Sequence, residues 1–289
     1  MLPLSPPPDP HPHPPKLKCP PGAADCHFHI YGPDGRYPPS PQRRSDVPDA
    51  LPPACRHLHD VLGIERLVVV QPSHYGTDNR RQLDAIAALG RPARAVVAVP
   101  FDIPDAELAR LHDAGARGVR FAVGPGGPSF ADIVRLSQRL APLRWHVEFH
   151  VVRSDDAPIL APALPVLRDL AVDLVIAHFA SVSAARGAEH PDFRALCDLV
   201  RGGRCWAKLS GGYRISDDPP PWRNVMPLAQ ALVAARADRL VWGSDWPHVN
   251  LHGPMPNSTD TLDCLLDWIP DEATRRCVLV DNPRTLYGF

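Results

Sequence analysis

The chain has 289 residues, which is enough for one large domain or two small ones with a buried core. Its 31 Lys and Arg residues almost balance its 32 Asp and Glu residues, so nucleic acid and anionic membranes are poor candidates for partners. It contains no apolar run of eighteen residues, no secretion-signal pattern and no CxxC pair among its seven cysteines, which together predict a cytoplasmic protein with free thiols.

Proline dominates the amino-terminal segment and occupies ten of the first 22 positions. Proline fixes its own φ, lacks an N–H donor and disfavours helix in the preceding residue. Residues 1–22 are therefore predicted to form an extended or disordered tail. His11 and His13 lie inside this tail, and without a rigid scaffold around them they do not predict a metal site.

From Ala24 onward, short apolar runs alternate with helix-like segments. This alternation is typical of a parallel α/β sheet, and eight runs predict a (β/α)8 TIM-type barrel that forms a single domain over residues 23–289. Segment 104–114 places Leu108 and Leu111 on one face, as expected of a helix in the outer ring. The predicted strands are residues 24–29, 66–71, 94–99, 118–121, 145–150, 172–178, 205–210 and 239–244.

Polar side chains recur where these apolar runs end. His27 and His29 are two residues apart on the first strand, so both imidazoles should lie on one face. Barrel enzymes build their sites at the carboxyl ends of the strands, so these polar residues predict one catalytic site at that mouth. On the later strands the same position is held by Gln71, Ser73, His74, Tyr75, Arg120, His178, Ser244, Asp245 and His248.

The fifth strand alternates polar and apolar residues, and its polar set is His146, Glu148 and His150. That set should face the barrel interior, which brings His150 near the two histidines of the first strand. Three imidazoles and one carboxylate would make a divalent-metal site suited to zinc. The alternative is that His150 is a hydrogen-bonded core histidine. On the seventh strand Lys208 either faces the site or extends its ammonium group to solvent.

The segments DCHFHIYGP, VVVQPSHYGTDN, AGARGVRF, DLVIAHFA and LVWGSDWPHVN occur in this order along the chain. With them the sequence resembles the amidohydrolase superfamily, in the branch of 2-pyrone-4,6-dicarboxylate hydrolase and related lactone hydrolases. The resemblance runs from about Ala24 to the carboxyl terminus and leaves only the proline-rich tail outside.

The resemblance implies a distorted (β/α)8 barrel with four catalytic residues, in which the aspartate activates water to attack a carbonyl. It also implies that Arg120 and Arg214 bind a substrate carboxylate or polarise the carbonyl. The alternative for each arginine is a salt bridge to a protein carboxylate. The implied catalytic residues are His27, His29, His178 and Asp245, and the implied pocket residues are Ser73, His248 and Asn250. His74 and Tyr75, at the polar end of the second strand, are expected to bind substrate beside them.

Four positions depart from the pattern of the pyrone dicarboxylate hydrolases. AVGPGGPS stands where they have a second arginine, Ser181 replaces another arginine, and Ser45 and His150 replace tyrosines. Recognition of two carboxylates needs several arginines, so this chain should take a less negatively charged substrate. The pyrone enzymes are regarded as metal-free and other superfamily members place a metal-binding histidine on this strand, so the cofactor cannot be copied from the nearest branch.

The predicted function is hydrolysis of a lactone or similar cyclic ester of a small carboxylated substrate by water activated at Asp245. An ordinary carboxylate is a weak base for water, which favours help from a metal. The predicted ligands of this divalent metal, most simply zinc, are His27, His29 and Asp245, with His150 as a further ligand and His178 free for catalysis.

Two other classes of function compete with this prediction. The first is zinc-dependent, non-oxidative decarboxylation of an aromatic or semialdehyde carboxylic acid, which His150 favours and the lactonase-like pattern opposes. The second is a binding or regulatory barrel without catalysis, against which the retained acid-base positions argue. The substrate ring, the pathway and association into a homo-oligomer are left open by the sequence.

Overall fold

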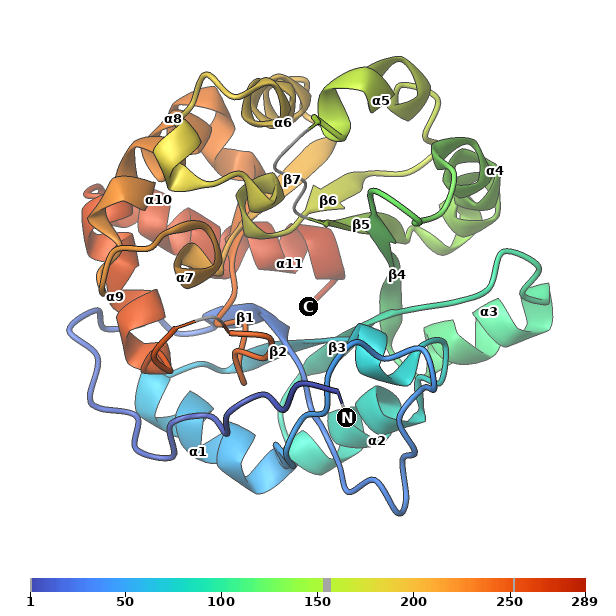
Figure 1. Cartoon of the computed structure of the whole chain (residues 1–289), viewed down its shortest axis with the longest axis horizontal. Helices are drawn as coiled ribbons and strands as arrows, with labels where there is room; N and C mark the ends of the chain where they lie inside the picture. Colours follow the sequence, from blue (N-terminus) through green and yellow to red (C-terminus); the bar gives the residue numbers. More distant parts are fainter. Residues whose placement is uncertain (1, 153–156, 252) are drawn as a thin grey trace.

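The computed structural model of the chain describes residues 2–152, 157–251 and 253–289. Eight strands form one sheet in the order β1 to β8, and each strand pairs in parallel with the next. Helices alternate with the strands and surround them as a ring (Figure 1). The predicted (β/α)8 barrel is therefore confirmed, as a barrel that is nearly closed.

The strands lie close to their predicted positions. The sixth and eighth are shorter than predicted, because the chain leaves the sheet before His178 and at Gly243. The strands are β1 Ala24–Phe28, β2 Arg66–Val70, β3 Ala93–Val97, β4 Ala116–Val123, β5 His146–Val151, β6 Leu174–Ile176, β7 Cys205–Leu209 and β8 Leu240–Trp242.

The outer ring is made of amphipathic helices. In α3, Leu108 and Leu111 are buried as their spacing predicts. None of the helices in the described part of the chain is long and apolar enough to cross a membrane. The helices are α1 Pro52–Leu62, α2 Arg80–Leu89, α3 Asp105–Asp113, α4 Phe130–Leu140, α5 Leu160–Leu167, α6 Pro191–Arg201, α7 Gly212–Ile215, α8 Met226–Arg236, α9 Ser258–Trp268, α10 Glu272–Arg276 and α11 Asn282–Tyr287.

Two apolar clusters hold the barrel together. The larger lies between strands and helices, and includes Val147 and Phe149 of β5. The smaller fills the barrel interior, where Cys26 and Trp206 pack with Tyr287 of α11. Figure 1 shows the carboxyl terminus near the centre of the ring. Side chains therefore fill the barrel interior at the end that α11 covers. The opposite mouth, at the carboxyl ends of the strands, is left for a site.

The proline-rich tail is extended and bonded to the barrel. The Ser5 N–H donates to the carbonyl of Asp46 in the β1–α1 connection, and the Asp46 N–H donates to the Pro3 carbonyl, both at 2.9 Å. These bonds form a short parallel bridge between Leu4 and Asp46. Further along, the Asp263 carboxylate in α9 accepts the backbone N–H groups of Lys16 and Leu17 at 3.1 and 2.9 Å. The tail passes α1 and α9 on its way to β1 (Figure 1).

Candidate active site

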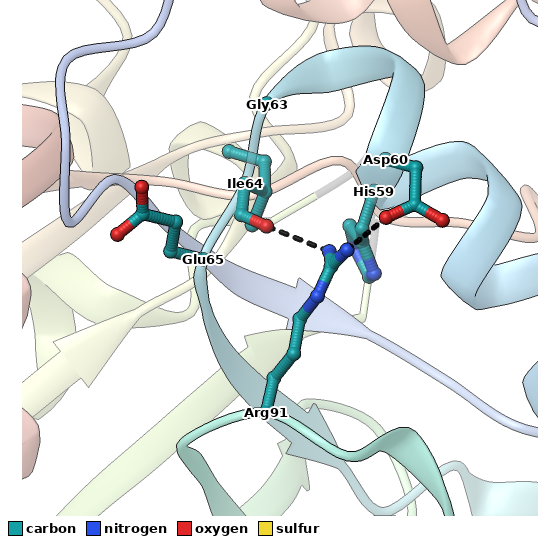
Figure 2. A pocket seen from close by; sticks show the side chains of 6 residues that line it. All are labelled: His59, Asp60, Gly63, Ile64, Glu65 and Arg91. Carbon is teal, nitrogen blue, oxygen red and sulfur yellow. Dashed lines mark hydrogen bonds and ion pairs between the residues drawn. The ribbon is translucent and has the colours of Figure 1, made fainter.

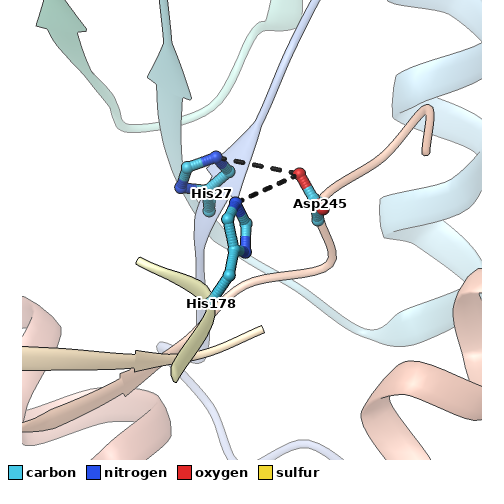
Figure 3. A group of neighbouring side chains, drawn as sticks. All are labelled: His27, His178 and Asp245. Carbon is cyan, nitrogen blue, oxygen red and sulfur yellow. Dashed lines mark ion pairs between the residues drawn. The ribbon is translucent and has the colours of Figure 1, made fainter. Parts of the chain in front are cut away.

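Four polar side chains converge at the carboxyl ends of three strands. His27 and His29 come from the end of β1, His178 follows β6 and Asp245 follows β8. The Nε2 atoms of the three histidines all lie near one carboxylate oxygen, Asp245 Oδ1. The distances are 3.8 Å for His27, 3.9 Å for His29 and 3.8 Å for His178. Figure 3 shows His27 and His178 pointing at this carboxylate from two sides. All four side chains are buried.

The Asp245 carboxylate is held through its other oxygen. Oδ2 accepts the Tyr213 hydroxyl at 2.6 Å and the Arg214 Nε–H at 2.5 Å, while Oδ1 has no hydrogen-bond partner among the described residues. Burial alone would raise the pKa of Asp245, but the charge of the Arg214 guanidinium holds it well below its usual value. Asp245 is therefore ionised at neutral pH, with Oδ1 free to act.

The histidines around this oxygen are neutral. Burial lowers the pKa of His29 to about 3 and that of His178 to about 4. Burial, followed by the charge of Lys208, holds the pKa of His27 well below its usual value. Each imidazole therefore carries one proton at neutral pH, and the partner of Nδ1 decides which nitrogen holds it.

The Nδ1 atoms of His29 and His178 each lie beside an oxygen atom. His29 Nδ1 lies 2.7 Å from the Val70 carbonyl oxygen, which can only accept, so Nδ1 carries the hydrogen and Nε2 presents a lone pair. His178 Nδ1 lies 2.9 Å from the Ser210 hydroxyl. A lone pair of His29 and a carboxylate oxygen of Asp245 thus face each other. Such a pair needs a proton donor or a cation between them.

A fully buried ion pair lies beneath His27. Lys208 Nζ donates to Glu148 Oε2 at 2.6 Å and to the Cys26 carbonyl at 2.8 Å, and it lies 3.2 Å from His27 Nδ1. Glu148 Oε1 lies 3.4 Å from the same Nδ1. Lys208 does not extend to solvent, because β7 directs it to the barrel interior, where the polar residues of β5 also point. This pair supports His27 from the side opposite to Asp245.

The two arginines have different surroundings. Arg214 forms a salt bridge with Asp245, so the alternative of a protein carboxylate partner applies to it. Arg120 donates Nη1–H to the Gln71 carbonyl at 3.0 Å and makes no ion pair with any described residue. Its guanidinium is therefore the cation of the mouth that a substrate anion can use. His150 is half-buried, its ring centroid is 5.7 Å from that of His178, and its Nδ1 has no partner in the described chain.

The remaining pocket candidates lie around the mouth at different depths. Ser73 is exposed on a short 3-10 turn, whereas His74 is buried and its ring packs edge-on against Tyr31 and Tyr75. Tyr75 accepts the Gly32 N–H at 2.7 Å, and His248 Nε2 lies 2.8 Å from the Ser258 hydroxyl. Tyr75 and His248 are therefore already bonded to protein groups.

Asn250, in the loop after β8, is hydrogen-bonded to two segments that are distant in sequence. Its side-chain oxygen accepts the Ser45 hydroxyl at 2.6 Å, and its backbone N–H donates to Ser5 of the tail at 3.2 Å. Ser45, which stands where the pyrone hydrolases have a tyrosine, is therefore bonded to the loop that follows β8.

Sequence reasoning missed Tyr213, although its hydroxyl binds Asp245. The signal was its position directly before Arg214, in a loop that follows β7. It also left Glu148 without a role. The signal there was that Glu148 and Lys208 are opposite charges on two strands whose polar residues both point inward.

A shallow depression elsewhere does not compete with this site. It lies beside Gly63 and Ile64, where α1 connects to β2. Figure 2 shows Arg91 across it, donating to the Ile64 carbonyl and pairing with Asp60. Its arginine is already paired, so the depression offers no free cation for an anionic ligand.

The sequence profile of the amidohydrolase family matches residues 24–289. The chain belongs to this family. The match begins at β1 and ends at the carboxyl terminus, so it spans the barrel and leaves out the tail. This confirms the resemblance inferred from the motifs and identifies the chain as an amidohydrolase-superfamily enzyme.

Similar proteins of this family cover nearly the whole chain. A 4-sulfomuconolactone hydrolase from Hydrogenophaga intermedia is 39% identical and covers 93% of this chain and 89% of its own length. A 2-pyrone-4,6-dicarboxylate hydrolase from Comamonas testosteroni is 35% identical, with coverages of 94% and 92%. A solved structure named as a probable 2-pyrone-4,6-dicarboxylic acid hydrolase from Acinetobacter baumannii, with citric acid bound, is 28% identical with a TM-score of 0.80 over 93% and 100% of the chains.

More distant solved structures share the fold alone. A zinc-bound amidohydrolase from Burkholderia multivorans is 19% identical with a TM-score of 0.68, covering 92% of this chain and 99% of its own. A 2,6-dihydroxybenzoate decarboxylase is 17% identical with a TM-score of 0.56, covering 92% and 98%. The decarboxylase alternative therefore has only a distant structural neighbour.

Members of the superfamily often bind a divalent metal, and three residues of this amidohydrolase fit one. Ligand atoms of His27, His178 and Asp245 lie within 4.8 Å of one another. His27 Nε2 and Asp245 Oδ1 are buried without partners in the described chain. The unpartnered Glu148 Oε1 could accept the Nδ1 hydrogen of His27 and leave Nε2 as a ligand. This cluster includes His178, which the sequence had left free, and does not include His29 or His150.

Proposed function

We propose that this amidohydrolase opens a lactone, or a similar cyclic ester, of a small carboxylated substrate. The observation that carries the proposal is Asp245, whose Oδ2 is tied to Tyr213 and Arg214 while Oδ1 points free into a ring of neutral imidazoles. The names of the relatives at 35% and 39% identity, both lactone hydrolases, support the same class of substrate.

Hydrolysis begins at the free carboxylate oxygen. Asp245 Oδ1 accepts a proton from water as the water oxygen attacks the carbonyl carbon of the lactone. Negative charge develops on the carbonyl oxygen, and in the metal-free protein an Nε2–H of His27 or His178 can donate to it. The ring C–O bond then breaks, and the proton on Asp245 passes to the leaving ring oxygen, which yields an open hydroxy acid or its keto tautomer.

The low pKa of Asp245 makes it a weak base, so the carbonyl or the water must be activated. We assign His27, His178 and Asp245 as the residues that would hold a divalent metal, zinc being the simplest match for two nitrogens and one oxygen. When bound, the metal polarises the carbonyl and lowers the pKa of water. His29, with its Nε2 lone pair 3.9 Å from Oδ1, is placed to join this set or to orient water.

The number of free cations at the mouth indicates how many negative charges the substrate carries. Arg120 is the guanidinium there that pairs with no described carboxylate, whereas Arg214 neutralises Asp245. Ser181 stands where an arginine is found in the pyrone hydrolases. One free guanidinium suits one carboxylate, held by two parallel N–H bonds. We therefore expect a lactone with fewer negative charges than the pyrone dicarboxylate.

The test is a panel of lactones. Purified protein, with its zinc content measured, is assayed on muconolactone, 4-sulfomuconolactone and 2-pyrone-4,6-dicarboxylate, with γ-butyrolactone as the uncharged control. We expect turnover of a carboxylated lactone, preference for muconolactone over the dicarboxylate, and loss of activity after chelation with recovery on adding zinc. Release of carbon dioxide from 2,6-dihydroxybenzoate without lactone turnover would favour the decarboxylase instead.

The variant Asp245→Asn separates chemistry from folding. It keeps the size of the side chain but removes the basic oxygen, so kcat should fall at least about a thousandfold with folding retained. Asp192→Asn is the matched control, because Asp192 is also buried and bonded but caps α5, where it accepts three backbone N–H groups at 2.7 to 2.9 Å. Lactonase activity near the wild-type level in Asp245→Asn would remove the mechanism.

A further inference from the structure

The barrel has one seam without a strand ladder. Each neighbouring pair from β1 to β8 is hydrogen-bonded, but β8 and β1, both fully described, are not paired as strands. His27 stands on one side of this seam and Asp245 follows the strand on the other. The distance between these two catalytic groups therefore depends on whatever replaces the ladder.

The buried carboxylate of Asp25 bridges this seam. Its Oδ1 accepts the backbone N–H of His27 and that of Ser244, both at 3.0 Å, so one oxygen holds β1 and the segment after β8 together. Its Oδ2 accepts the Ser244 hydroxyl at 2.5 Å and meets Nε2 of His59, in α1, at 3.0 Å. Partners on both oxygens leave the carboxylate no freedom to rotate.

The local backbone is shaped for this bridge. The pairing of β1 with β2 shifts between Asp25 and Phe28, an irregularity that frees the His27 N–H from the ladder. A Cβ at Gly243 would lie 2.5 Å from the His27 Cβ, so only glycine allows this approach. Asp245, with φ of 61°, donates its backbone N–H to the His27 carbonyl at 2.7 Å. His29 likewise donates its backbone N–H to the Trp246 carbonyl at 2.9 Å, so two backbone hydrogen bonds and the Asp25 carboxylate together join β1 to the segment that carries Asp245.

We propose that Asp25 is a positioning residue, which together with two backbone hydrogen bonds takes the place of the missing β8–β1 ladder and sets the separation of His27 Nε2 from Asp245 Oδ1. It does not touch substrate. Its importance for turnover rests on the proposed function, whereas its structural effect on the seam can be measured without any substrate. Misplacement of catalytic groups by about 1 Å can cost about a hundredfold in rate, so a small opening of the seam should be visible in kcat.

The experiment compares Asp25→Ala and Ser244→Ala with Asp192→Ala as control. Ser244→Ala loses the hydroxyl donor to Asp25 Oδ2 but keeps the backbone N–H bonded to Oδ1, so it is the milder variant. On the best lactone of the panel, per folded molecule, we expect kcat to fall about a hundredfold in Asp25→Ala and about tenfold in Ser244→Ala, with KM changed less than about threefold. Asp192→Ala should lose stability without loss of kcat.

Hydrogen exchange of the wild type and variants supplies the readout that needs no substrate. Amides in residues 24–30 and 243–248 should exchange faster in Asp25→Ala and Ser244→Ala, and should be unchanged in Asp192→Ala. The inference is overturned if kcat per folded molecule stays within twofold in Ser244→Ala, or if exchange in both segments is unaltered. If Asp25→Ala fails to fold, Ser244→Ala decides by the same two criteria. If the wild type turns over no lactone, the proposed function fails, and exchange alone decides for or against the bridge.

Discussion

Replacing Lys208 with Met should destabilise the fold by leaving a carboxylate buried without its cation. Lys208 and Glu148 are both fully buried and 2.6 Å apart. Removing one partner of such a pair costs about 3–5 kcal/mol, because the remaining charge keeps its desolvation penalty. The donation to the Cys26 carbonyl and the contact with His27 Nδ1 are lost with the ammonium. We expect the upper part of that range.

The loss of stability in Lys208→Met should depend on pH, and the direction of that dependence can be worked out. In the wild type, burial raises the pKa of Glu148 but Lys208 and then Arg120 bring it below its usual value. Its contribution is therefore present above the pKa of the unfolded carboxyl and is lost as pH falls through the folded value. Without Lys208, burial dominates and raises the folded pKa, so the variant loses stability as pH rises. The difference between wild type and variant should be larger at pH 8 than at pH 5.

Urea denaturation of Lys208→Met and wild type at these two pH values measures both effects. Arg110→Met is the matched control, because it removes an exposed ion pair with Glu107, which is worth about 0–1 kcal/mol. The reasoning fails if Lys208→Met costs no more than Arg110→Met, or if its cost is larger at pH 5 than at pH 8.

Other predictions concern the site and the tail. Arg120→Ala should raise KM about tenfold or more with little loss of stability, whereas Arg214→Ala should lower kcat because Asp245 loses its charged partner; equal effects on KM would contradict this division of roles. In wild type, kcat/KM should be constant from about pH 5.5 to 8, since Asp245 is ionised and His29, with a pKa of about 3, is neutral throughout; an inflection near about pH 6.5 would contradict it. Deleting residues 2–16 removes hydrogen bonds worth about 1 kcal/mol each, and a calorimetric Tm lower by several degrees should follow; an unchanged Tm would show that the tail does not hold the barrel.

Much of the architecture could be predicted from the sequence, because it depends on patterns within short segments of the chain. Continuous apolar runs are what strands covered on both faces require, and their alternation with amphipathic segments identifies the barrel. The polar ends of those runs marked His27, His178 and Asp245, since all parallel strands deliver their carboxyl ends to one mouth. The polar set of β5 also indicated, from its period of two, which residues point inward.

Only the tertiary structure decided how those groups use one another. Which oxygen of Asp245 is tied and which is free depends on Arg214, a residue 31 positions away. The proton on His29 is placed by a carbonyl of the next strand, and the barrel seam is held by Asp25, which the sequence shows only as the residue before a cysteine. Hydrogen bonds and ion pairs depend on angstrom-scale distances between residues remote in sequence, and the period of a strand or helix carries no information about them.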